Sequence, residues 1–298
     1  MTTRSISTSL PALAGKTRPQ TWRKVQDWLM QGFSLLALAL AVGAMIWVLG
    51  TILLRGAEAL GWEFLTNPTK PYGIPGAGIA NALLGTLLVT LCAAVVAIPP
   101  ALLAGIWLAE FGKASPVAAA LRFSANVMMG MPSVIVGLFV YMALVVPMGC
   151  FSGFAGAVAL AILMFPVIMR TTEEMLLMVP DTLRESGLAL GLTRCRVTLQ
   201  IICRSARNGL VTGVLLSVAR VSGETAPLLF TALFADSWPT HFFSGPTPNI
   251  PVLITEYATN SPFEAMHRAG WGAALVIALI VLLINLVARV CFRDKRAH

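Results

Sequence analysis

Six long apolar segments constrain this chain more than any other feature of its sequence. A helix needs about 20 apolar residues to cross the hydrocarbon core of a bilayer, so each segment predicts one membrane-spanning helix. Charged residues make up only 11% of the chain, against about 25% in a soluble domain. The sequence therefore predicts an all-α polytopic membrane protein without a sizeable soluble domain. The six segments are 31–54, 82–108, 127–148, 154–170, 208–233 and 270–292.

Clusters of lysine and arginine orient these segments. The formal net charge is +8, and the basic residues gather where the positive-inside rule expects cytoplasmic segments, not on a soluble face that would bind nucleic acid. We therefore expect a cytoplasmic N-terminal segment at 1–30, a transmembrane domain at 31–292 with a cytoplasmic loop at 171–207, and a cytoplasmic tail at 293–298. The clusters are Lys16, Arg18, Arg23 and Lys24; Arg184, Arg194, Arg196, Arg204 and Arg207; and Arg289, Arg293, Lys295 and Arg296.

Cysteine and histidine do not form a recognisable site. The five cysteines fall mostly in spans or on the expected cytoplasmic side, which argues against a disulfide framework. The three histidines are scattered and lack zinc spacing, so we expect no metal site.

Proline and glycine mark the expected breaks in the helices. The connections at 55–81 and 239–251 are rich in both residues and predict ordered, non-helical loops. Pro99-Pro100 is expected to kink the second span. The stretch from Gly130 to Gly137 is expected to combine a kink with close helix packing.

Arg220 and Glu224 interrupt the fifth apolar segment. Residues four apart in a continuous helix share one face about one turn apart. Charges at this depth are costly and often mark the path of an ion or substrate. A buried Arg–Glu pair that only holds helices together is the alternative.

The polar loop at 171–207 has the pattern of two short helices joined by a glycine turn. Thr182 and Glu185 have the spacing of a capping box. Gly191 falls where a C-terminal cap is expected, and Thr193 is placed to open the second helix. A solvated amphipathic loop is the alternative.

This loop resembles the EAA loop of ABC importer permeases. The match is carried by Glu185-Ser-Gly-Leu-Ala-Leu-Gly191, with Ile201 ten residues on. Two small residues stand for the two alanines of the family pattern and are expected to expose a small-residue face, whereas Cys203-Arg204 replaces Leu-Pro. In that family the loop docks on the ATPase subunit. The resemblance therefore implies an ATPase-coupling surface made by Glu185, Ser186, Gly187, Gly191 and Ile201.

Four further segments narrow the resemblance to PstA-type permease subunits of the phosphate-specific transport (Pst) importers. The resemblance runs in order and in register from about residue 78 to 234. It implies the type I ABC importer permease fold in a bacterial inner membrane, with both termini cytoplasmic. The segments are Gly78–Thr86, Met131–Phe139, Phe165–Glu174 and Arg220–Phe230.

The resemblance also implies what the chain would do. It would form half of the translocation path of an ATP-driven phosphate importer and transmit ATPase closure through the loop. The implied partners are a homologous second permease, an ATP-binding cassette ATPase dimer, a periplasmic or extracellular phosphate-binding protein, phosphate and lipid. The sequence has no Gly-x-x-x-x-Gly-Lys-Ser/Thr loop. We therefore expect a non-catalytic subunit without a cofactor, with ATP and Mg on the ATPase.

Arginine is the side chain best suited to such a substrate, because its planar fork of donors matches phosphate. We expect Arg220 to line the path, with Glu224 holding it, and Arg170 to add a positive charge near the exit. Ser222 and Thr225 are further candidates. The alternatives are interfacial snorkelling for Arg170 and backbone hydrogen bonding for the two hydroxyls.

Three other functions stay open at this point. The same architecture could carry another oxyanion, such as sulfate, molybdate or a phosphonate. A secondary transporter or channel would often show inverted repeats, and none is evident in the sequence. A receptor or scaffold would bind a ligand without any flux.

Overall fold

The computed structural model describes residues 20–112 and 115–291. The expected basic residues Lys16 and Arg18, and those at 293–296, lie outside this part of the chain. The chain divides into two compact units, Met1–Thr51 and Ile52–His298, which are described separately. Helix α1 (Gln20–Ala57) supplies the first expected span; its apolar side chains within the first unit are exposed, and its residues from Ile52 onward belong to the second unit.

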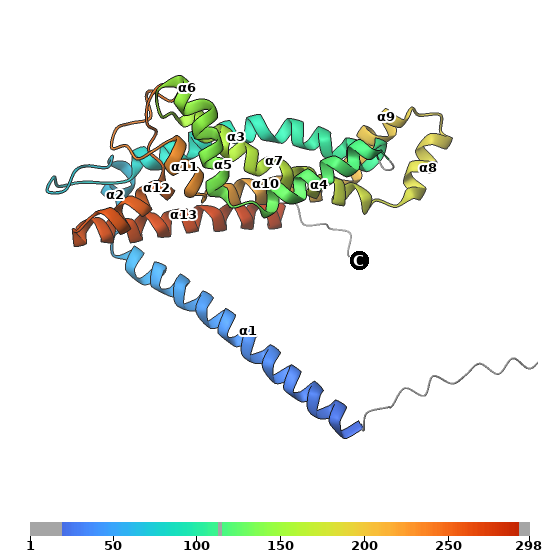
Figure 1. Cartoon of the computed structure of the whole chain (residues 1–298), viewed down its shortest axis with the longest axis horizontal. Coiled ribbons are helices and arrows are strands. Elements are labelled where there is room, and N and C mark those ends of the chain that lie inside the picture. The colour runs from blue at the N-terminus through green and yellow to red at the C-terminus, as the bar shows by residue number, and fades with distance from the viewer. Residues whose placement is uncertain (1–19, 113–114, 292–298) are drawn as a thin grey trace, which may run out of the picture. The chain divides into compact units, whose positions relative to one another are not determined.

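Five of the six expected spans are confirmed as single helices or runs, and the expected third span is a bent pair; several boundaries are different. The described residues contain five helices long and apolar enough to cross a membrane, or six when one bent pair counts as a single span. Small residues on α3 pack against α7, as expected where transmembrane helices approach closely. In the second unit, α8 lies at one end of the bundle and α2 and α12 lie at the other (Figure 1). The spans of this unit are α3 (Ala80–Ile106), extended by the π-helical turn η1 (Trp107–Phe111); α7 (Gly153–Leu177); α9 (Arg194–Arg196), η3 (Val197–Ile202) and α10 (Cys203–Val221) in one run; and α13 (Glu264–Cys291).

The third span is bent rather than straight. Helix α4 (Pro116–Gly130) meets α5 (Ser133–Val140) at an angle of 102°, and η2 (Tyr141–Val145) and α6 (Val146–Met148) complete the segment. The residue before a proline disfavours the helical region, and Met131 accordingly has an extended backbone with ψ 136°. The interval 109–126, which the expected spans leave as a connection, is mostly helical, because α4 already begins at Pro116.

The expected loop at 171–207 is much shorter in the structure. Helix α7 continues past its predicted end at 170, and the run that becomes α10 begins at Arg194 instead of 208. The remaining connection holds the short helix α8 (Asp181–Ala189). The Arg184 guanidinium donates to the carbonyls of Leu176 and Val179 at the end of α7. Basic side chains often satisfy the last carbonyls of a helix in this way.

Two connections at the end opposite α8 contain more helix than expected. Helix α2 (Trp62–Thr66) lies in the first, and α12 (Ile250–Thr255) with η4 (Glu256–Asn260) lies in the second. Both connections meet the buried Asn81 at the start of α3. Its amide nitrogen donates to the Thr69 hydroxyl at 2.7 Å and to the carbonyls of Asp236 and Ser237 at 3.2 Å. The side chain of one helix residue therefore joins both connections.

Candidate functional site

The candidate path residues lie at the turn between α10 and α11 (Ala226–Thr231). Helix α10 ends at Val221, so Arg220 occupies its last turn while Glu224 lies in the connecting turn. The expectation that both residues share one helix face is wrong. Gly223 lowers helix propensity at the break, and Pro227 is compatible only with the first turn of the next helix.

Arg220 and Glu224 are not paired with each other. Arg220 is exposed and Glu224 is half-buried. Within residues 20–112 and 115–291, no ion pair joins them, and the Arg220 guanidinium has no hydrogen-bond partner. The fork of the Arg220 guanidinium is therefore open to a ligand or to a neighbouring chain.

The two hydroxyl candidates differ in availability. Ser222 is buried, and its Oγ donates to the Ala219 carbonyl at 2.8 Å, the backbone bond that the alternative interpretation anticipated. Thr225 is half-buried, and its carbonyl accepts from the amides of Leu228 and Leu229 at 3.1 Å. Thr225 therefore begins α11 through its backbone.

Helix α5 packs directly behind this turn. A Cβ atom added to Gly137 would lie 2.6 Å from the Pro227 Cα and 3.2 Å from its carbonyl oxygen. Leu228 on the same short helix is buried in the main core with α3 and α7. Two of the segments that carry the family resemblance, Met131–Phe139 and Arg220–Phe230, are thus in van der Waals contact.

Arg170 belongs to a buried charge cluster. Glu173, with a side chain only 2% exposed, accepts from Arg170 Nη1 and from Arg122 Nε, the latter at 2.6 Å. Arg122 also donates to the Leu108 carbonyl at 3.2 Å. Because α7 continues to Leu177, Arg170 is not at a helix end, so snorkelling from one does not describe it. The spacing of Arg170 and Glu173 could have indicated their pairing, whereas the contribution of Arg122 from α4 had no local signal.

Helix α8 carries the candidate coupling residues on two different faces. Glu185 and Ser186 are exposed, but Gly187 is buried against η3. A Cβ atom at Gly187 would lie 2.8 Å from Ile201 Cδ1 and 2.9 Å from Val197 Cγ2. The expected exposure of Gly187 is therefore wrong, because the small residue lets α8 approach another helix of the same chain.

Three expectations concerned the helix ends in this loop, and two of them are confirmed. The predicted capping box is absent: Pro180 precedes the helix without a side-chain cap, and Thr182 lies inside it. Gly191 has φ +79°. Its amide donates to the Leu188 carbonyl at 2.9 Å, and the next amide donates to Gly187 at 3.3 Å, which is the Schellman pattern. Thr193 Oγ1 accepts from the Arg196 amide at 3.4 Å, so it opens the second helix as predicted.

A part-buried ion pair joins α8 to the end of α3, and sequence reasoning missed it. Arg184 Nη2 donates to Glu110 Oε1 at 2.8 Å, with the two side chains 13% and 9% exposed. Hydrogen bonding to Glu110 raises the pKa of Arg184, while burial lowers it by less. The two residues are far apart in the sequence, so only the fold brings them together.

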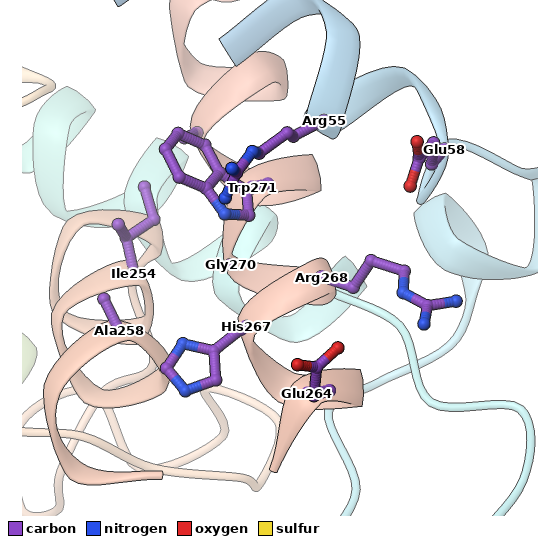
Figure 2. A pocket seen from close by; sticks show the side chains of 10 residues that line it. Arg55, Glu58, Ile254, Ala258, Glu264, His267, Arg268, Gly270 and Trp271 are labelled. Atoms are coloured by element: carbon purple, nitrogen blue, oxygen red, sulfur yellow. The ribbon is translucent and has the colours of Figure 1, made fainter. Parts of the chain in front are cut away.

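A separate cavity of about 770 Å³ lies between the end of α1, η4 and the first turns of α13. The Arg55 guanidinium lies over the Trp271 ring, 5.4 Å from its centroid (Figure 2). His267, Arg268 and Glu264 also line this cavity. None of these side chains was a candidate site residue, and all of them lie outside the segments that carry the resemblance.

Comparison with known proteins agrees with this architecture. Residues 101–293 match the family described as "Binding-protein-dependent transport system inner membrane component". The fold is similar to an inward-facing structure of the MetNI methionine ABC transporter, with a TM-score of 0.59 at 18% identity, covering 72% of this chain and 94% of that chain.

Relatives of closer sequence are similar over nearly their whole length. The phosphate transport system permease protein PstA of Yersinia pestis is 38% identical, over 99% of this chain and 100% of the relative. The PstA proteins of Haemophilus influenzae and Pasteurella multocida are 41% and 42% identical, each over 92% of this chain and 96% of the relative.

The helical bundle and its helix–glycine–helix loop thus define an inner-membrane permease component of the type I ABC importer fold. Such a protein crosses the membrane several times, which agrees with the spans described above. Within this class, the chain belongs to the PstA family of phosphate transport system permease proteins.

Proposed function

We propose that this chain is the permease subunit that forms half of the translocation path of an ATP-driven phosphate importer. The observation that carries this proposal is the 38% identity to a phosphate transport system permease protein over 99% of this chain and 100% of that relative. A match of this extent includes the turn after α10 as well as α8. No observation favours sulfate, molybdate or a phosphonate as the cargo.

The energy for transport comes from a separate ATP-binding cassette ATPase dimer, which binds ATP and Mg. In support of this, the sequence lacks a nucleotide-binding loop, so the chain is a non-catalytic subunit without its own cofactor or metal. The dimer docks on α8 at its exposed Glu185 and Ser186. Gly187 and Ile201 set the position of α8, and Gly191 sets its end.

Arg220 contacts phosphate along the path, and a homologous second permease forms the other half of that path. The support is that Arg220 is exposed and that its guanidinium has no partner among the described residues. Arg170 contributes positive charge less directly, since Glu173 already holds it. Glu224 and Thr225 lie beside the path in the same turn, and Ser222 stabilises the end of α10.

The orientation follows from the basic clusters. Both termini and α8 are cytoplasmic, in keeping with an even number of spans and with the positive-inside rule. Residues 1–30 and 293–298 are short cytoplasmic segments that precede and follow the membrane domain in the sequence. A periplasmic or extracellular phosphate-binding protein delivers phosphate to the end of the bundle opposite α8.

The test is uptake of radiolabelled phosphate by cells in which this chain replaces their own permease of this family. We expect uptake that requires an ATPase able to hydrolyse ATP and that an excess of sulfate, molybdate or phosphonate does not displace. Displacement by one of these anions would reassign the cargo. Uptake that persists without the ATPase but collapses with the proton gradient would identify a secondary transporter. Phosphate binding without uptake would identify a receptor.

A further inference from the structure

The Arg184 side chain connects three elements at the α8 end of the bundle. Its Nε donates to both Glu110 carboxylate oxygens, at 3.1 and 3.2 Å. Its Nη2 donates to Glu110 Oε1 at 2.8 Å and to the Leu176 carbonyl at 2.7 Å. Its Nη1 donates to the Val179 carbonyl at 2.6 Å and to Asp181 at 2.9 Å. A guanidinium has five N–H donors in a fixed fork, and acceptors surround all three of its nitrogens here.

The partners of Arg184 are not equivalent. Glu110 is 9% exposed and is held by the fork through two of its nitrogens, whereas Asp181 is 76% exposed and lies within α8 itself. A surface pair such as Arg184–Asp181 contributes little. Removing one partner of a largely desolvated pair such as Arg184–Glu110 is more disruptive, because the other charge is left uncompensated. Of the two acidic partners, Glu110 is therefore the one that links Arg184 to another element, at the end of α3.

Glu110 lies where the end of α3 changes its winding. The turn η1 (Trp107–Phe111) is π-helical, and such turns are frequent at functional positions. Helix α3 is also the main packing partner of α7 in the membrane domain. The last turn of α3 thus brings this transmembrane helix into contact with α8.

Helix α8 has two kinds of attachment to the rest of the chain. Gly187 packs against Val197 and Ile201 of the run that leads into α10, and Arg184 binds Glu110 at the end of α3. The first contact is apolar. The second is charged and directional, because two guanidinium nitrogens donate to the same carboxylate.

We propose that the Arg184–Glu110 pair is a positioning contact that makes α3 move with α8, so that ATPase closure reaches α3 as well as α10. This inference rests on the proposed function, in which α8 is the docking helix. Arg184 and Glu110 touch neither phosphate nor nucleotide. Their loss therefore changes how much transport each hydrolysed ATP drives, rather than the ability to hydrolyse ATP.

The experiment uses the complete complex of both permeases and the ATPase dimer in proteoliposomes, with phosphate-loaded binding protein on the outer side. Phosphate imported and ATP hydrolysed are measured together. The variant Glu110→Gln keeps the shape of the side chain and one acceptor oxygen but removes its charge. Arg184→Lys keeps the charge but not the fork. Asp181→Asn is the matched control, because it removes only the exposed partner of the same arginine.

We expect Glu110→Gln and Arg184→Lys to retain ATP hydrolysis while phosphate imported per ATP falls at least about fivefold, the lower range of a typical coupling free energy. Asp181→Asn is expected to keep the normal ratio. A normal ratio in assembled Glu110→Gln would overturn the inference. If the unmodified complex imports no phosphate, the proposed function fails, and the inference fails with it.

A second measurement does not depend on either of these variants folding. Spin labels are placed on cysteines at Leu190 and Phe111, which are 80% and 47% exposed, in a chain whose native cysteines are replaced by serine. The inference expects the same separation between labels in nucleotide-free and ATP-bound complexes, because α8 and the end of α3 move together. A separation that changes with nucleotide would overturn it even if Glu110→Gln fails to assemble.

Discussion

Replacing Gly137 by alanine tests the contact between α5 and the turn that carries Arg220. The added Cβ would lie 2.6 Å from the Pro227 Cα, whereas ordinary van der Waals contact begins at 3.4 Å. The two helices must therefore separate by about 0.4 Å to bring this contact to 3.0 Å and by about 0.8 Å to reach ordinary contact, and both of the nearest atoms belong to backbone, which cannot rotate away.

The expected change in the free energy of unfolding of Gly137→Ala follows from two opposing effects. Overpacking a close-packed interior costs about 1–3 kcal/mol, and replacing glycine by alanine inside a helix returns about 0.5–1 kcal/mol. We expect Gly137→Ala to be about 1–2 kcal/mol less stable, equivalent to a decrease in Tm of about 2–6 °C. Phosphate uptake should fall by more than the loss of folded protein explains, because Pro227 and the turn before it are displaced.

The assay compares Tm in detergent and phosphate uptake in cells for Gly137→Ala and Gly61→Ala. Gly61 is a suitable control because nothing lies within 4 Å of its added Cβ and its φ of −153° suits any residue. Equal Tm and equal uptake for the two variants would refute the claim that α5 and α11 are in rigid contact.

Three further changes test other contacts. Glu173→Gln leaves Arg122 without a carboxylate and Arg170 with only the exposed Glu174, 3.7 Å away, so we expect a loss of about 2–4 kcal/mol, seen as a lower Tm; an unchanged Tm would contradict the charge cluster. Gly191→Ala forces a residue with a Cβ into φ +79° and should cost about 1–2 kcal/mol, measured as weaker co-purification of the ATPase, while Gly191→Asn is expected to be milder. Arg220→Ala, inserted normally, is expected to lose phosphate uptake, with partial activity in Arg220→Lys; normal uptake by the alanine variant would remove Arg220 from the path.

The spans could be predicted from the sequence because apolar length alone requires them. Their ends could not, since local polarity is a poor guide where tertiary contacts extend a helix. Helix α7 continues past Arg170 because Glu173 compensates that arginine and Arg184 satisfies the last carbonyls. The run into α10 begins at Arg194, well before its apolar stretch, because Thr193 caps it and Gly187 packs against it.

In the candidate site, too, features set by neighbours in the sequence could be predicted, whereas features set by distant segments could not. The glycine cap at Gly191 and the opening of the next helix at Thr193 depend on neighbours in sequence, and both were predicted. The shared face of Arg220 and Glu224 was inferred from continuous helical periodicity, although Gly223 and Pro227 signalled a break. The Glu110–Arg184 contact depends on folding of distant segments, so a single sequence contains no local signal for it.

Asn81 determines what a partner would meet at the end of the bundle opposite α8. Its amide group holds Thr69 of one connection and the carbonyls of Asp236 and Ser237 of another. An aspartate there would offer acceptors only, and a leucine would offer no polar group at all. The two connections therefore form one surface that is held to the start of α3. Neither connection can move away without breaking its hydrogen bonds to Asn81, the residue that also holds the other connection.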